Sequence, residues 1–145
     1  MNTTLHTWFL TFAGLVASLV GALATFGPEV LLAEVKHAEV SGSAVVMART
    51  AGVLLLCIGG LTLAVRRHPP SPSLEAVMGF GLAVQLALLP IDPAAYRAGV
   101  FRELGSFLPN TLLHLVLALG FGASAWAVRR ARRGSALHTA TPMHP

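Results

Sequence analysis

Residues 5–26 read LHTWFLTFAGLVASLVGALATF and contain no aspartate, glutamate, lysine or arginine. A helix needs about 20 apolar residues to cross a membrane, where lipid offers the backbone no hydrogen-bond partners. The whole chain of 145 residues has a similar character, since 54% of its residues are hydrophobic and 11% are charged. Soluble domains carry about 25% charged residues. The composition therefore excludes an ordinary soluble enzyme and indicates a membrane protein.

Three further segments are long and apolar enough to span a membrane. We predict an all-α fold, a polytopic membrane protein with four transmembrane helices in an up-down bundle. The third span is short, and the second reaches full length only by including Arg49. The spans form a single domain, residues 1–133, and the segment 134–145 has no apolar stripe and is predicted to be disordered. The four spans are expected at about 5–26, 44–65, 74–90 and 110–128.

A secretory signal peptide is the alternative interpretation of residues 5–26, because Ala22-Leu23-Ala24 resembles a cleavage site between small residues. However, no Lys or Arg precedes the apolar run, and the run exceeds the roughly 7–15 residues of a signal core. We therefore expect this segment to remain as a membrane span.

Six of the ten basic residues lie in two clusters, Arg66-Arg67 and 129–133, and each cluster directly follows an apolar run. Basic residues flank spans on the cytoplasmic side of membranes. Two spans separate the clusters, so both chain ends are predicted to face the cytoplasm. Trp8 and Trp126 fall at the same interface, where indole rings are enriched. The positive charge of the chain thus indicates its topology, and we expect no nucleic-acid partner. The cluster 129–133 either anchors this topology or attracts anionic lipid.

Both outer loops are expected to contain short helices that lie on the membrane. One begins at Pro28-Glu29, and the other at Asp92-Pro93, where an aspartate N-cap precedes a first-turn proline.

Cys57 is the only cysteine, which excludes an internal disulfide and a cysteine-based zinc site.

Small residues recur at helical spacing in every span, and they permit close helix contact in lipid. Packing within one four-helix bundle is the simpler interpretation, and a homodimer face is the alternative. The small residues include Gly14, Ser18, Ala22, Gly21, Gly52, Gly59, Gly60, Gly79, Gly81, Gly120 and Ser124.

Polar side chains near the outer ends of three spans share one predicted depth. An ionisable group at this depth is costly unless it is paired or hydrated, so each is a candidate ligand-binding residue. The shared depth predicts a polar pocket that opens outward, and its positive charge would be neutralised by Asp92, Glu39 or Glu103. Alternatively, the arginine reaches headgroups or a loop carboxylate, and the other side chains make interhelical hydrogen bonds. The candidate ligand-binding residues are Arg49, Gln85, Asn110 and His114.

Several activities lack the residues that they require. His6 and His114 lie too far apart in depth to share a haem iron, and His114 has no second intramembrane ligand for a metal site. The first span has no carboxylate of the kind used by small multidrug exporters. No nucleophile-base-acid constellation is visible, since Ser18 and Ser124 have no ionisable neighbour at helical spacing. We therefore expect no catalytic residues, no metal and no cofactor.

The layout resembles a broad group of small, uncharacterised bacterial four-helix integral membrane proteins of the domain-of-unknown-function type. The resemblance implies a fold and a bacterial inner-membrane location, and it implies no activity. It covers about residues 5–128 and rests on residues 26–32, residues 48–55, Gly81 with Gln85, and residues 110–114 before Leu119-Gly120.

We therefore expect a non-catalytic inner-membrane protein that is an accessory protein or binds a small or lipidic ligand in the outer-leaflet pocket. The alternative is a subunit of a small transporter or channel for an anion or a proton, and an enzyme acting on lipid or quinone is a third interpretation. Expected partners are membrane lipids, with a homo-oligomer or another membrane protein left open. Below the outer layer the polar residues are chiefly Ser18, Thr62 and Ser124, which favours the first interpretation.

Overall fold

The computed structural model describes residues 3–101 and 103–139, and within these ranges every regular element is a helix. Four helices are long and apolar enough to cross a membrane, which confirms the predicted all-α, multi-pass fold. In chain order the elements are α1 (Thr3–Phe26), α2 (Pro28–Val30), the π-helix η1 (Leu31–Val35), α3 (Gly42–Val65), α4 (Pro72–Leu88), α5 (Ile91–Arg97), the 3-10 helix η2 (Leu104–Ser106) and α6 (Leu108–Thr139).

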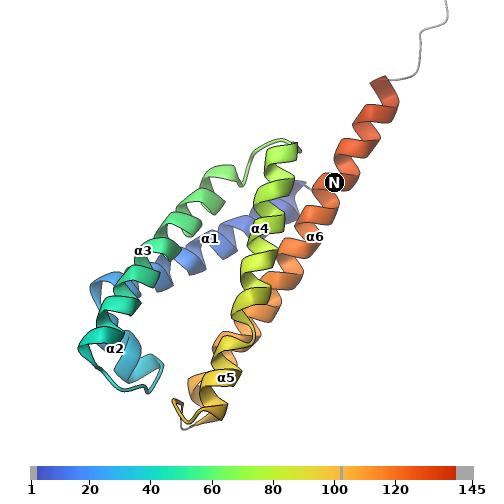
Figure 1. The fold of residues 1–145 in the computed structure, drawn as a ribbon. Helices are drawn as coiled ribbons and strands as arrows, with labels where there is room; N and C mark the ends of the chain where they lie inside the picture. The colour runs from blue at the N-terminus through green and yellow to red at the C-terminus, as the bar shows by residue number, and fades with distance from the viewer. Residues whose placement is uncertain (1–2, 102, 140–145) are drawn as a thin grey trace, which may run out of the picture.

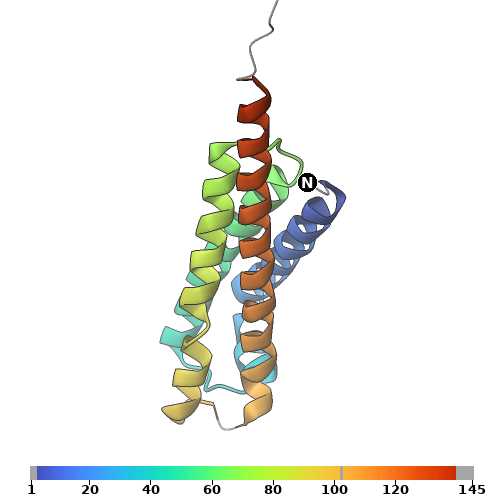
Figure 2. The same ribbon diagram turned by 90° about the vertical axis from the view of Figure 1, so that its right-hand side faces the viewer.

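The long helices form two antiparallel hairpins, α1 with α3 and α4 with α6 (Figure 1). The Thr7 hydroxyl near the start of α1 donates to the carbonyl of Arg66, which caps α3, 3.2 Å away. Glu75 at the start of α4 binds Arg132 near the end of α6. Both ends of the described chain therefore lie at one end of the molecule, which we call the arginine end because it carries 66–67 and 129–133. The opposite end, formed by α2, η1, α5 and η2, is the loop end (Figure 2).

Small residues bring α1 and α3 into backbone contact. A Cβ atom added to Gly52 would lie 2.8 Å from the Gly21 carbonyl oxygen, and one added to Gly59 would lie 2.9 Å from the Gly14 carbonyl oxygen. Such close approach is how helices gain van der Waals contact in lipid, where hiding apolar surface gives little. The structure thus uses these glycines for packing within one chain, as the simpler interpretation expected.

The two hairpins meet in a core toward the arginine end. Phe9 of α1 packs edge-on against Phe121 of α6, with ring centroids 5.2 Å apart. Gly120 makes room for the Phe9 ring, and Gly81 of α4 makes room for the Phe121 ring. The buried members of this core are Leu10, Ala13, Leu74, Met78, Leu117, Phe121 and Val128.

Large apolar side chains cover the outer surface of the bundle. Leu19 is 70% exposed, Phe80 is 65% exposed and Leu119 is 68% exposed. In water such a surface would cause association, whereas lipid tails solvate it. The exposed faces therefore agree with the span assignment.

Each long helix begins two residues before its predicted start, and α4 and α6 also differ from the prediction at their C-terminal ends. The third predicted span ends at Pro90, but α4 ends at Leu88, and the short helix α5 follows after a turn. The predicted disordered segment 134–145 is helical as far as Thr139, because the Arg, Ala and Leu residues of 129–139 favour helix; residues 140–145 lie outside the described residues. The short helices predicted in the two loops are present as α2 with η1 and as α5, but α5 begins at Ile91 after Pro90, so Asp92 lies in its first turn and is not its N-cap.

Candidate ligand-binding site

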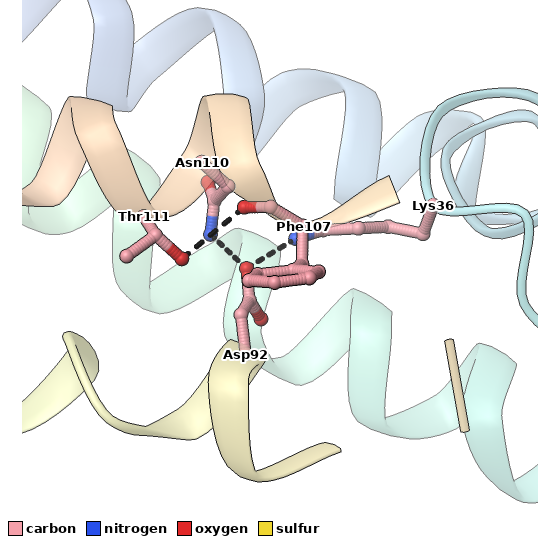
Figure 3. A network of polar contacts seen from close by, with 5 residues as sticks. All are labelled: Lys36, Asp92, Phe107, Asn110 and Thr111. Carbon is pink, nitrogen blue, oxygen red and sulfur yellow. Dashed lines mark hydrogen bonds and ion pairs between the residues drawn. The ribbon is translucent and has the colours of Figure 1, made fainter. Parts of the chain in front are cut away.

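The loop end is held together by Asp92, which is placed by the first turn of α5 (Figure 3). Its Oδ2 atom accepts a hydrogen bond from Nζ of Lys36 at 3.0 Å and another from Nδ2 of Asn110 at 2.7 Å. Lys36 follows η1 and Asn110 lies in the first turn of α6, so one carboxylate joins three elements that are distant in sequence. The side chains of Lys36 and Asp92 are 22% and 13% exposed. Their charges therefore balance each other in a largely buried setting.

Lys36 is also held by an aromatic ring. Its Nζ atom lies 5.6 Å from the ring centroid of the buried Phe101, a distance at which the ring quadrupole attracts a cation. The π-helix before Lys36 matters for this geometry, because each π turn shifts the following residues around the helix axis. The backbone and the ring together fix the only lysine of the chain beside the only aspartate.

A second polar layer lies one helical turn further from the loop end. Nδ1 of His114 in α6 donates a hydrogen bond to Oε1 of Gln85 in α4 at 2.6 Å, and Gln85 is 9% exposed. Asn110 and His114 are four residues apart and so lie on one face of α6. The two polar layers therefore join α4 and α5 to α6.

Arg49 does not join these layers. Its guanidinium lies 3.7 Å from Oε1 of Glu29, and both side chains are more than half exposed. The expectation that Arg49 converges with Gln85, Asn110 and His114 on one pocket rested on equal depth. Equal depth does not fix the position around the bundle, and Arg49 belongs to the α1–α3 hairpin. The pairing with a loop carboxylate is the alternative that the sequence had left open.

A cavity of about 280 Å³ opens between the two hairpins beside the Asp92 contacts. Apolar side chains from α1, η1 and α6 form most of its wall, and polar groups lie at the loop end. Ser106 is 4% exposed, and its hydroxyl has no hydrogen-bond partner among the described residues. The cavity is lined by Val20, Leu23, Leu31, Val35, Lys36, Gly105, Ser106, Pro109, Asn110 and Leu113.

A larger, more polar hollow of about 880 Å³ adjoins this cavity. Leu31 and Lys36 line both spaces, so Lys36 stands where the two meet. His37 and Glu39 also line the larger hollow, which accounts for its polar character. The sequence identified neither Lys36 nor Ser106 as a site residue; the signal available for Lys36 was that it is the single lysine.

Two buried or paired groups at the arginine end were also missed. Glu75 forms ion pairs with Arg132 and, at 3.5 Å, with Nε of Arg129. His6 is 7% exposed, and neither ring nitrogen has a hydrogen-bond partner among the described residues. Glu75 thus links α4 to α6. The buried imidazole of His6, in contrast, has no hydrogen bond within the described chain to offset its loss of hydration.

The site has the chemistry of a binding pocket. Among residues 3–101 and 103–139, no group of three or more His, Cys, Asp or Glu side chains is placed to hold a metal ion. An apolar wall with hydrogen-bonding groups at one end suits a molecule with an apolar body and a polar head.

Comparisons of the chain with protein-family models, with curated proteins and with solved structures gave no match.

Proposed function

We propose that this protein is a non-catalytic accessory protein of a bacterial inner membrane that binds a small lipidic ligand between its two hairpins. The observation that carries the proposal is the cavity lined by Val20, Leu23 and Leu113. At its polar end lies the Ser106 hydroxyl, which has no hydrogen-bond partner among the residues that the structure describes. Apolar walls favour an acyl or prenyl chain, and a buried hydroxyl without a partner favours a ligand that accepts its hydrogen bond.

The head group of this ligand carries no net charge. Among the described residues, Lys36 is the only cation that lines the cavity, and Asp92 already neutralises it at 3.0 Å. An anionic head would have to compete with that carboxylate, and a cationic head would meet the ammonium group. A neutral head accepts from Ser106 and exchanges hydrogen bonds with the Asn110 amide without disturbing the ion pair.

The orientation follows from the distribution of charge. The arginine end holds six of the ten basic residues of the chain, and Glu75 is its only carboxylate among the described residues. Cytoplasmic flanks are rich in arginine and lysine. We therefore assign both chain ends to the cytoplasm and the cavity to the outer leaflet.

The alternative of a transporter or channel subunit needs polar groups that continue from His114 along the bundle. On α6 the next buried residues are Leu117, Ala118 and Phe121, before Ser124 is reached. This apolar interval gives an ion no hydration, and it favours the binding protein over a conducting path.

Filling the cavity tests the proposal. We expect Val20→Trp and Leu113→Trp to reduce the neutral lipid that copurifies with the protein, measured by mass spectrometry of organic extracts. The matched controls are Leu19→Trp and Leu112→Trp, whose side chains are 70% and 53% exposed and should face bulk lipid. Equal lipid content in the cavity variants and the controls would refute the proposal, as would the absence of any stoichiometric lipid in the wild type.

A further inference from the structure

A second concave site lies at the arginine end, on the side of α6 that faces away from the core. Trp126, Arg129, Arg130 and Arg133 line a hollow of about 140 Å³, which we call the arginine cup. Residues three and four apart share one face of a helix, so these four side chains are neighbours. Trp126 is 62% exposed, whereas the adjacent Val128 is fully buried in the core. The cup therefore opens outward.

The cup is organised by contacts on both sides. The Arg130 guanidinium lies 5.4 Å from the ring centroid of Trp126, which forms an aromatic wall. On the other side, Glu75 of α4 holds Arg129, with 3.5 Å between its Oε1 atom and Nε. In the part of the chain that the structure describes, no carboxylate pairs with Arg130 or Arg133. The guanidinium groups of Arg130 and Arg133 are thus available beside that of Arg129, which Glu75 positions.

The location of the cup defines the anion that it meets. The arginines of the cup directly follow residues 104–128, which contain no Asp, Glu, Lys or Arg, and tryptophan is enriched at the level of the headgroups. Guanidinium groups bind phosphate oxygens through paired, charge-assisted hydrogen bonds. We propose that the arginine cup binds the phosphate of an anionic phospholipid, one molecule per chain, at the opposite end from the cavity for the neutral ligand.

A specific phosphate site and diffuse attraction to a basic surface respond differently to substitution of individual arginines. The probe is phosphatidylglycerol, titrated against protein in nanodiscs of phosphatidylcholine and scored by native mass spectrometry of the released complex. We expect Arg130→Gln/Arg133→Gln to weaken binding by at least about tenfold, because charge-assisted hydrogen bonds are lost. The matched control, Arg66→Gln/Arg67→Gln, removes the same charge at the same end and should leave binding within about threefold of the wild type. Equal losses in both variants would overturn the proposal.

Glu75→Gln separates the two mechanisms by the sign of its effect. The substitution makes the arginine end more positive, so diffuse attraction predicts tighter binding of phosphatidylglycerol. The built cup predicts weaker binding, because Glu75 no longer fixes Arg129. Tighter binding would therefore contradict the proposal.

Two further arms complete the test. Inorganic phosphate at millimolar concentration should not displace the lipid; displacement would show that a soluble anion is the ligand and would overturn the assignment. Leu113→Trp should leave phosphatidylglycerol binding unchanged, because it lies in the other cavity. The cup and the proposed neutral-lipid site can thus fail independently.

Discussion

Replacement of Gly52 by alanine tests the contact between α1 and α3 directly. The added Cβ atom would lie 2.4 Å from Thr25 Oγ1, 2.7 Å from Thr25 N and 2.8 Å from the Gly21 carbonyl oxygen. The last two are backbone atoms, so no change of side-chain rotamer relieves the overlap. Ordinary contact begins at 3.4 Å, so the helices must separate by roughly 0.7 Å at this point. Overpacking of this kind costs about 1–3 kcal/mol.

Gly60→Ala is the matched control, because it makes the same substitution in the same helix. A Cβ atom at Gly60 meets nothing within 4 Å, and alanine improves helix propensity by up to about 1 kcal/mol. Both variants gain this helix propensity equally, so we expect their free energies of unfolding to differ by the overpacking cost alone, about 1–3 kcal/mol. The measurement is reversible unfolding in mixed micelles of mild detergent and dodecyl sulfate, followed by tryptophan fluorescence. Equal stability of Gly52→Ala and Gly60→Ala would refute the backbone contact.

Three other substitutions have defined outcomes in the same unfolding assay. Asp92→Ala should lower the free energy of unfolding by about 1–3 kcal/mol, since Lys36 loses its partner but is partly exposed. The double variant Lys36→Met/Asp92→Leu should lower it less, because no unpaired charge remains. A larger loss in the double variant than in Asp92→Ala would contradict the buried ion pair. A double-mutant cycle of Gln85→Leu and His114→Leu should give a coupling energy of about 0.6–1.7 kcal/mol, and a value near zero would argue against their hydrogen bond. His6→Leu should raise the free energy of unfolding by about 1–3 kcal/mol, because a buried imidazole that has no partner among the described residues is replaced by an apolar side chain. Destabilisation would show that His6 has a partner.

The four spans and much of their packing chemistry could be predicted from the sequence. Hydrocarbon thickness imposes a minimum apolar length, and this constraint acts on each segment separately, so residues 5–26 and 110–128 stand out without knowledge of the rest. Gly52 and Gly59 could be recognised as contact positions because small residues bring helices together in lipid. The hydrogen bond between Gln85 and His114 was one of the interpretations left open, and the structure contains it.

The pairing of spans and the contents of the cavity could not be predicted. The depth of a residue in the membrane follows from its position along a span, whereas the neighbour of each helix depends on shape complementarity over many residues. For this reason Arg49 was predicted to lie with Gln85 and His114, although it belongs to the other hairpin and pairs with Glu29. Lys36 enters the site through a π-helical turn that no local pattern indicates. Ser106 lies in a short 3-10 helix and becomes significant only through burial of its hydroxyl. Glu75 was overlooked because a single carboxylate in the first turn of a span resembles an ordinary interface residue.

The most direct test of the proposed neutral-lipid site is photo-cross-linking with a neutral lipid that carries a diazirine in its chain. The protein is reconstituted in nanodiscs, irradiated and mapped by peptide mass spectrometry, with an excess of unlabelled neutral lipid as competitor. We predict that labels sensitive to the competitor fall on the cavity wall, at Val20, Leu23 and Leu113, and that labels on the exposed Leu112 and Leu119 persist as bulk-lipid contacts. Labelling of the cavity wall that is absent, or that the competitor does not reduce, would contradict the account.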